Sequence, residues 1–187
     1  MSDTKEKIKK IAINLFYKRG YFATGINDIA RRAGIQKSSI YYHYANKEEI
    51  LFDILKTTMQ DLQSNFVRSV HEASDAEAQL AAAIRSHIIF HLSRQKEAII
   101  SDSELRGLTV RNYKTILAMR DDYEYRFQEV LRKGIAERVF AEMDYKVISY
   151  GIITMCTAVA FWFRKTGRLS KEEIAEVYAG FILNGLK

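Results

Sequence analysis

The chain has no proline in 187 residues and only nine glycines. Proline interrupts helices and glycine supplies many tight turns, so their scarcity favours long helices over sheets joined by β-turns. Apolar residues make up 48% of the sequence and charged residues 28%, values typical of a folded globular protein. We therefore predict an all-α fold.

Apolar spacing and capping residues divide the sequence into about nine helices, three of them within the first 44 residues. Predicted N-terminal caps are Asn46 with Glu49, Ser74 with Glu77, and Ser170 with Glu173. The expected helices cover residues 4–19, 25–33, 37–42, 46–66, 74–94, 96–106, 110–133, 144–167 and 170–184. The long helix from Asn46 is expected to bridge a domain of residues 1–46 and a larger domain of residues 47–187.

The longest apolar run, from Val147 to Phe163, is interrupted by polar residues and a glycine. It is shorter than the roughly 18 to 20 residues that span a bilayer, so we predict a helix buried on most sides and no membrane contact. The charged N-terminus lacks the apolar stretch of a signal peptide, and the single cysteine, Cys156, cannot form an internal disulfide. The cytoplasm, a reducing compartment, is the predicted location.

The positive charge is unevenly distributed along the chain. Residues 1–56 contain eleven Lys and Arg against six Asp and Glu, so they carry +5 of the net charge of +6. This asymmetry predicts that the N-terminal part, and not the remainder, binds a polyanion.

Two short helices in the basic region are joined by a three-residue turn that contains Gly34. The helices are expected at residues 25–33 and 37–42, which is the arrangement of a helix-turn-helix. Ile40 is the one core anchor of the second helix, so its other side chains are free to reach phosphates or base edges in a major groove. Tyr42 and Lys47 are assigned mainly to phosphate contacts, and Tyr44 is expected to point inward.

The run from Thr24 to Leu55 resembles the DNA-binding domain of the TetR family of bacterial transcriptional repressors. The motif covers about residues 5–55, and its matching positions include Phe16, Gly20, Thr24, Ile29, Ala30, Ala33, Gly34, Ile40, Tyr41-Tyr42-His43, Lys47 and Leu51. Gln36 departs from the family, which often has a small residue where the recognition helix begins, and glutamine caps a helix poorly. Predicted contacts with double-stranded operator DNA come from Thr24, Gln36, Lys37, Ser38, Ser39, Tyr41, Tyr42, His43 and Lys47. The alternative is a basic three-helix bundle that merely packs.

In the C-terminal two-thirds, the resemblance implies helices that enclose an effector pocket and a homodimer formed by the last two helices. The sequence suits this, since those helices carry broad apolar stripes, Val147–Trp162 and Ile174–Ile182. Such stripes would expose more apolar surface than a monomer normally tolerates. The alternative is that they form the core of a monomer.

The segment around Arg120, Tyr123 and Glu124 resembles the corresponding helix of acyl-CoA-responsive members of the family, and Trp162 with Arg164 resembles a second feature of those members. The resemblance implies a hydrophobic small-molecule effector, with an acyl-CoA as the candidate. The predicted ligand-binding residues are His87, His91, Arg106, Met119, Arg120, Tyr123, Phe127, Met155, Trp162 and Arg164. The alternative is that the apolar residues among these pack in the core and that the arginines lie on a solvated face.

His87 and His91 lie one helical turn apart, a spacing that can also chelate a metal. Neutral histidines that line a pocket are commoner, so we predict no metal and no cofactor. The sequence has no Gly-rich phosphate loop, no G-x-S-x-G motif and no paired cysteines, so we predict that the protein is not an enzyme. A ligand-controlled repressor is the preferred function. The alternatives are a ligand-blind or activating regulator and a helical carrier or enzyme.

Overall fold

The computed structural model describes residues 2–187, and every regular element in that range is helical, which confirms the all-α prediction. The helices are α1 Ser2–Arg19, α2 Ile26–Ala33, α3 Lys37–His43, α4 Lys47–His71, α5 Ala76–Ser93, α6 Gln95–Ser103, the 3₁₀ turn η1 Leu105–Gly107, α7 Val110–Ala136, α8 Tyr145–Thr157, α9 Val159–Trp162 and α10 Lys171–Gly185. The chain divides into two compact units. The first contains the described residues up to Met59 together with Lys96–Leu117, and the second contains Gln60–Gln95 and Ala118–Lys187. The domain boundary predicted between residues 46 and 47 falls at the start of α4 and stays a prediction.

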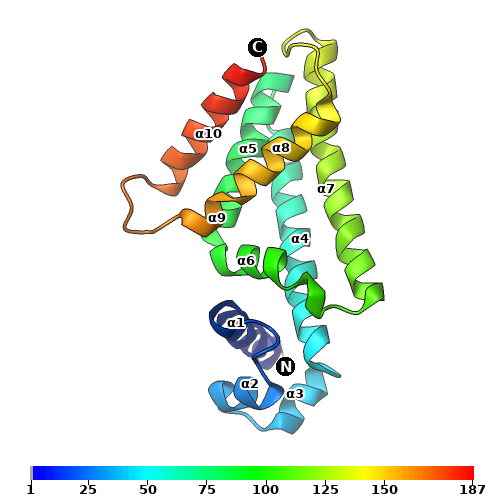
Figure 1. Cartoon of the computed structure of the whole chain (residues 1–187), viewed down its shortest axis with the longest axis vertical. Coiled ribbons are helices and arrows are strands. Elements are labelled where there is room, and N and C mark those ends of the chain that lie inside the picture. The colour runs from blue at the N-terminus through cyan, green and yellow to red at the C-terminus, as the bar shows by residue number, and fades with distance from the viewer. Residues whose placement is uncertain (1) are drawn as a thin grey trace. The chain divides into compact units, whose positions relative to one another are not determined.

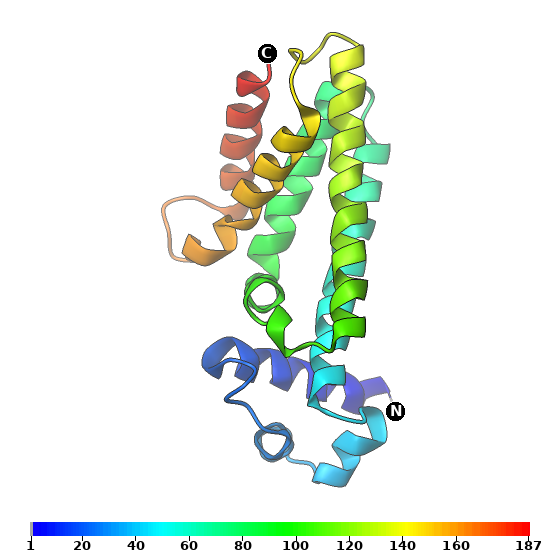
Figure 2. The same ribbon diagram turned by 45° about the vertical axis from the view of Figure 1, so that its right-hand side comes forward.

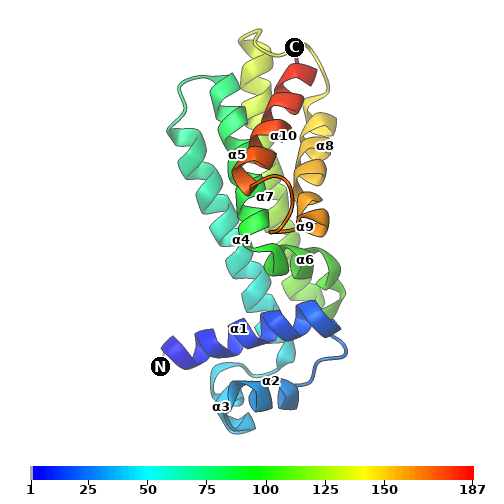
Figure 3. The ribbon, with the colours of Figure 1, turned by 90° about the vertical axis from the view of Figure 1, so that its left-hand side faces the viewer.

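Helices α1, α2 and α3 form a small bundle in the first unit, in which α1 packs against the other two (Figure 3). Gly20 and Gly34 follow α1 and α2 with φ of 83° and 64°, the left-handed conformation that ends a helix. The predicted ends of these two helices are therefore confirmed. The bundle core consists of Ile8, Ala12, Phe16, Ile29, Ala30, Ala33 and Ile40, each at most 5% exposed.

In the second unit, α10 lies alongside α5, and α8 packs on α5 as well (Figure 1). Arg85 of α5 donates two hydrogen bonds to the carboxylate of Glu176 in α10, at 2.6 and 2.8 Å. The cap of α10 is as predicted, because Ser170 accepts from the Glu173 amide and Glu173 accepts from the Ser170 amide. At α5 the predicted cap is wrong by one residue, since Asp75 and not Ser74 accepts from the backbone of Ala78.

The apolar segment predicted as one helix over residues 144–167 is divided in the structure. Helix α8 ends at Thr157, and the short α9 follows it and stops at Trp162, well before Gly167 (Figure 2). The side-chain amide of Gln95 donates to the carbonyls of Ala160, at 2.7 Å, and Phe163, at 3.1 Å. This amide satisfies carbonyls that a helix end leaves open, so α9 can stop without a glycine.

The segment Tyr145–Trp162 is also less buried than predicted. It is one candidate membrane span by length and apolar composition, but only 28% of it is buried inside the described chain. The prediction of a helix buried on most sides is therefore wrong. Large side chains on the outer face of this segment include Val147, Tyr150, Phe161 and Trp162, each more than half exposed.

Candidate functional site

The turn between α2 and α3 is built by backbone groups. The Gly34 amide donates to the carbonyl of Arg31 and the Ile35 amide to that of Ala30, which ends α2. Gln36 occupies the N-terminal cap of α3, and its side chain makes no capping hydrogen bond. Helix α3 therefore begins without a side-chain cap, in agreement with the poor capping by glutamine.

Helix α3 presents nearly all of its side chains outward. Ile40 is its one fully buried residue. Tyr41 and Tyr42 are 47% and 70% exposed, and the ammonium group of Lys37 lies 5.6 Å from the centre of the Tyr41 ring. The structure thus gathers on one short helix six of the residues predicted to contact DNA: Lys37, Ser38, Ser39, Tyr41, Tyr42 and His43. Their predicted contacts with DNA stay predictions.

Tyr44 closes α3 and points inward as predicted, with 3% of its surface exposed. Its hydroxyl donates to Asp53 Oδ2 at 2.7 Å, and the ammonium groups of Lys9 and Lys5 lie 3.5 and 3.7 Å from the same carboxylate. Burial alone would raise the pKa of Asp53, but the Tyr44 hydroxyl and the two lysines outweigh it and hold that pKa below its usual value. This network, which sequence reasoning missed, joins α1 and α4 to the end of the recognition helix.

Two other residues predicted to contact DNA are turned toward the loop between α1 and α2. Lys47 Nζ donates to the carbonyls of Tyr21, at 2.9 Å, and Thr24, at 2.8 Å, and it lies 4.1 Å from the centre of the Tyr21 ring. Thr24 is buried, and its hydroxyl donates to the carbonyl of Gly20 at 2.9 Å. Both side chains thus fix the loop that positions α2, and burial lowers the pKa of Lys47.

The first unit also ties α6, η1 and the start of α7 to α1 and α4. Lys96 donates to the side-chain oxygen of Asn14. Glu48 in the first turn of α4 accepts from the Thr109 amide and from the Asn112 side chain, each at 2.9 Å. Gly107 in η1 lies so close to Tyr21 that an added Cβ would fall 2.6 Å from its ring, which explains a glycine at this position. These contacts make the α6–η1 segment part of the body that carries α3.

A buried polar cluster lies in the second unit, where α5 meets α7 and α8. His87 is 1% exposed and His91 7%, and their rings stack with centres 4.1 Å apart. The two ring nitrogens of His87 face the Tyr123 hydroxyl at 2.9 Å and the Thr157 hydroxyl at 3.0 Å. His91 Nδ1 donates to the His87 carbonyl at 2.9 Å, so its Nε2 carries the lone pair.

Both histidines are neutral near pH 7. Burial first, and then the neighbouring His91, lowers the pKa of His87 well below the usual value. Burial also lowers the pKa of His91 to about 4, although its hydrogen bond to the His87 carbonyl acts in the opposite direction. No cluster of three or more His, Cys, Asp or Glu side chains that could hold a metal occurs within residues 2–187. The arrangement therefore suits hydrogen bonding to a neutral polar group.

The other residues predicted to bind the ligand are distributed unevenly. The rings of Tyr123 and Phe127 contact the ring of His87. Phe66 of α4, which the sequence analysis did not single out, contacts the rings of Tyr123 and Phe127. Met119, Arg120 and Met155 are half-buried. Arg106, Trp162 and Arg164 are exposed on η1, on α9 and just after it. Their contacts with an effector stay predictions.

Comparisons with known proteins cover both units. Residues 8–54 match the family model described as bacterial regulatory proteins, tetR family, and residues 73–186 match the Tetracyclin repressor-like C-terminal domain. The HTH-type transcriptional repressor KstR2 of Rhodococcus jostii is 27% identical over 188 residues, which cover 99% of this chain and 92% of that protein.

Two solved structures have a similar fold. A bacterial regulatory protein in the tetR family from Rhodococcus RHA1 superimposes with a TM-score of 0.93 at 22% identity, over 100% of this chain and 98% of that one. AibR, solved in complex with isovaleryl coenzyme A and operator DNA, superimposes with a TM-score of 0.87 at 26% identity, over 95% of this chain and 97% of that one.

Proposed function

Because this chain belongs to the TetR family of bacterial transcriptional regulators, we propose that a hydrophobic small molecule releases it from operator DNA. The family makes it a DNA-binding transcriptional repressor and not an enzyme. The proposed effector is an acyl-coenzyme A. The proposed location is the cytoplasm, where operator DNA and coenzyme A esters are both accessible.

The DNA contacts that we propose come from the outward face of α3. Lys37, Ser38 and Ser39 lie in its first turn, and Tyr41, Tyr42 and His43 follow. A recognition helix reads base edges in the major groove with its N-terminal residues, and phenolic hydroxyls and lysines donate to phosphates. The exposed rings of Tyr41 and Tyr42 have no place in the core of the first unit, which supports a role in binding.

A homodimer through α8, α9 and α10 is the proposed assembly. Val177 and Phe181 of α10 are 59% and 69% exposed, and large apolar residues of α8 and α9 are exposed as well. Gly151 and Gly180 have nothing within 4 Å of the position of an added Cβ, so a second helix could approach closely there. A dimer that binds two half-sites one turn of DNA apart requires its two recognition helices to lie about 34–36 Å apart.

The buried pair of His87 and His91 carries the proposal of an effector site. Two imidazoles, a phenol and a threonine hydroxyl are costly to bury among apolar helices unless each is hydrogen-bonded. His91 Nδ1 is used by the His87 carbonyl, so Nε2 is the ring nitrogen of His91 that accepts a hydrogen bond. An acyl-CoA offers amide N–H donors in its pantetheine arm together with an apolar chain, and the rings of Phe66 and Phe127 suit that chain.

Release would operate through α4. This helix starts at Lys47 in the first unit and continues to His71 in the second. A ligand shifts an equilibrium only by its difference in affinity for the two states, and coupling of about 1–3 kcal/mol, or 5- to 150-fold, is typical. We expect effector binding near Phe66 to move α4 and, with it, the recognition helix.

The test is a titration of acyl-CoAs of increasing chain length into a complex of the protein with its own promoter fragment, followed by fluorescence anisotropy. The expected result is a saturable loss of operator affinity of at least fivefold at the best chain length, with calorimetric heat for the same compound. His91→Leu is expected to weaken the effector while operator affinity in its absence is retained. Undisturbed operator binding and no heat with any chain length would contradict the acyl-CoA proposal and leave a ligand-blind regulator as the alternative.

A further inference from the structure

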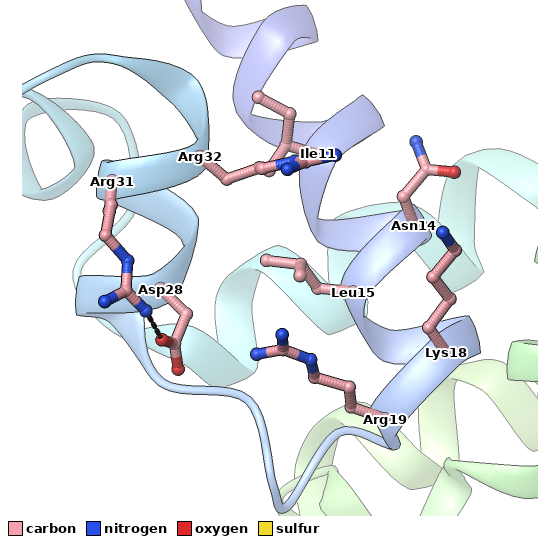
Figure 4. A pocket seen from close by; sticks show the side chains of 8 residues that line it. All are labelled: Ile11, Asn14, Leu15, Lys18, Arg19, Asp28, Arg31 and Arg32. Carbon is pink, nitrogen blue, oxygen red and sulfur yellow. Dashed lines mark hydrogen bonds and ion pairs between the residues drawn. The ribbon is translucent and has the colours of Figure 1, made fainter.

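A basic groove lies between the C-terminal half of α1 and helix α2 in the first unit. Its volume is about 910 Å³. The apolar side chains of Ile11 and Leu15 lie toward its interior, and four cationic side chains, Lys18 and Arg19 from α1 and Arg31 and Arg32 from α2, surround them (Figure 4). None of these cations lies on the recognition helix, so the groove is separate from the face already described.

The groove carries an excess of positive charge that its own residues do not neutralise. Asp28 is its one acidic side chain, and it accepts from Arg31 at 2.6 Å and from the Gly25 amide at 3.1 Å. Lys18 and Arg32 are exposed, and within residues 2–187 they form no hydrogen bond or ion pair. Two cations thus remain available, and a third, Arg19, acts on Asp28 only through space.

An anion is the chemistry that this arrangement suits, and the position of α2 favours DNA over an acidic protein. In a helix-turn-helix the first helix lies across the sugar–phosphate backbone while the second enters the major groove. Here the first helix is α2, and Arg31 and Arg32 stand in its last turn. Part of the excess positive charge of residues 1–56 therefore lies in the groove between α1 and α2, away from α3.

We propose that the groove between α1 and α2 binds phosphates of the DNA backbone outside the base pairs read by α3, with Lys18 and Arg32 as the principal contacts. This proposal rests on the proposed DNA binding and adds a contact that carries no sequence information. Phosphate contacts set position and affinity, whereas base contacts set specificity. The groove should therefore govern the salt dependence of binding and leave sequence preference unchanged.

The experiment compares a double variant of the groove, Lys18→Gln with Arg32→Gln, and a control double variant, Lys114→Gln with Lys165→Gln. The control side chains are exposed and, within residues 2–187, form no ion pair, so both variants lose two positive charges at sites that tolerate it. Affinity for the footprinted operator and for a scrambled duplex of equal length is measured from 50 to 300 mM salt. Removing one phosphate contact reduces the slope of log K against log salt by about 0.9, so removing two from each protomer of a dimer reduces it by about 3 to 4.

The expected result is this shallower slope for the groove pair alone, with an unchanged ratio of operator to scrambled affinity and an unchanged melting temperature. A slope equal to that of the control pair would overturn the proposal and point to an acidic protein as the partner of the groove. A fall in the operator-to-scrambled ratio would also overturn it, since the residues would then act through the position of α3. Failure of the unaltered protein to bind either duplex would instead refute the proposed function.

Discussion

Asp53 links three helices of the first unit, and replacing it with alanine is the sharpest test of how α3 is held. The substitution removes the acceptor of the Tyr44 hydroxyl and the partner of the Lys9 ammonium group, whose side chain is only 13% exposed. A hydrogen bond to a charged group contributes about 1.5–3 kcal/mol, and a buried hydroxyl left without a partner costs about 1–3 kcal/mol. The exposed pair with Lys5 adds at most about 0.5 kcal/mol. We expect Asp53→Ala to reduce the free energy of unfolding by about 3 kcal/mol.

Two further variants separate the contributions. Asp53→Asn keeps an acceptor for the Tyr44 hydroxyl and loses only the charge, so we expect a loss of about 1 kcal/mol. Tyr44→Phe keeps the carboxylate with its lysines and removes the hydroxyl, with an expected loss of about 1–2 kcal/mol. Urea unfolding followed by circular dichroism at a fixed protein concentration measures all three, since unfolding of a dimer depends on concentration.

The pH dependence of the Asp53→Asn difference gives the stricter test. The pKa of Asp53 in the folded chain lies below its usual value, about 3.9 in an unfolded chain. A carboxyl with a depressed folded pKa stabilises fully above the unfolded pKa and loses that contribution as pH falls through the folded one. The advantage of the unaltered protein over Asp53→Asn should therefore be constant from pH 7 to about 5 and shrink below about 4. A difference that stays constant down to pH 3, or one below 0.5 kcal/mol at pH 7, would refute the reasoning.

Three other predictions concern the dimer, the histidine pair and the loop. Phe181→Glu places a charge on the exposed apolar stripe of α10 and should weaken dimer association by at least about 2 kcal/mol, which is thirtyfold in the dissociation constant. Sedimentation velocity measures this, and a variant that still sediments as a dimer at low protein concentration would contradict the proposed assembly. Burial lowers the pKa of His91 to about 4 in the folded chain, against about 6.5 in an unfolded chain, so the free energy of unfolding should fall by about 3 kcal/mol between pH 7 and 4. His91→Leu should remove this part of the pH dependence, and parallel pH profiles of the variant and the unaltered protein would contradict the prediction. Lys47→Met should lower stability by about 1–2 kcal/mol with an unchanged salt slope of operator binding, whereas a slope reduced by about 0.9 for each protomer would support a phosphate contact.

Features of the fold that depend on neighbouring residues could be predicted from the sequence. Gly20 and Gly34 end their helices in the left-handed conformation, and Ser170 with Glu173 begins α10, because each signal acts within one turn of the chain. The outward face of α3 was predictable for the same reason, since one apolar residue, Ile40, leaves the rest of a seven-residue helix without a core to join.

Features fixed by contacts between distant residues were missed. Near the end of α9, the Ala160 carbonyl accepts from the amide of Gln95, 65 residues earlier, and no local pattern indicates this contact. The contacts of Lys47 were not foreseen either, since its ammonium group donates to two carbonyls 23 and 26 residues away; its predicted contact with DNA stays a prediction. Likewise the spacing of His87 and His91 favoured neutral histidines that line a pocket, but only the positions of Tyr123 and Thr157 identify the hydrogen-bond partners of His87.

The contacts of Glu48 bear on how a signal could travel along the chain. Glu48 fastens the start of α7 to the start of α4 through Thr109 and Asn112, and both helices then continue from the first unit into the second. In the second unit the same two helices meet again, with the Phe66 ring of α4 5.5 Å from the Tyr123 ring of α7. We therefore expect an effector that changes the packing of these two rings to act on both helices. Helix α4 carries Asp53, whose carboxylate accepts from the Tyr44 hydroxyl at the end of the recognition helix.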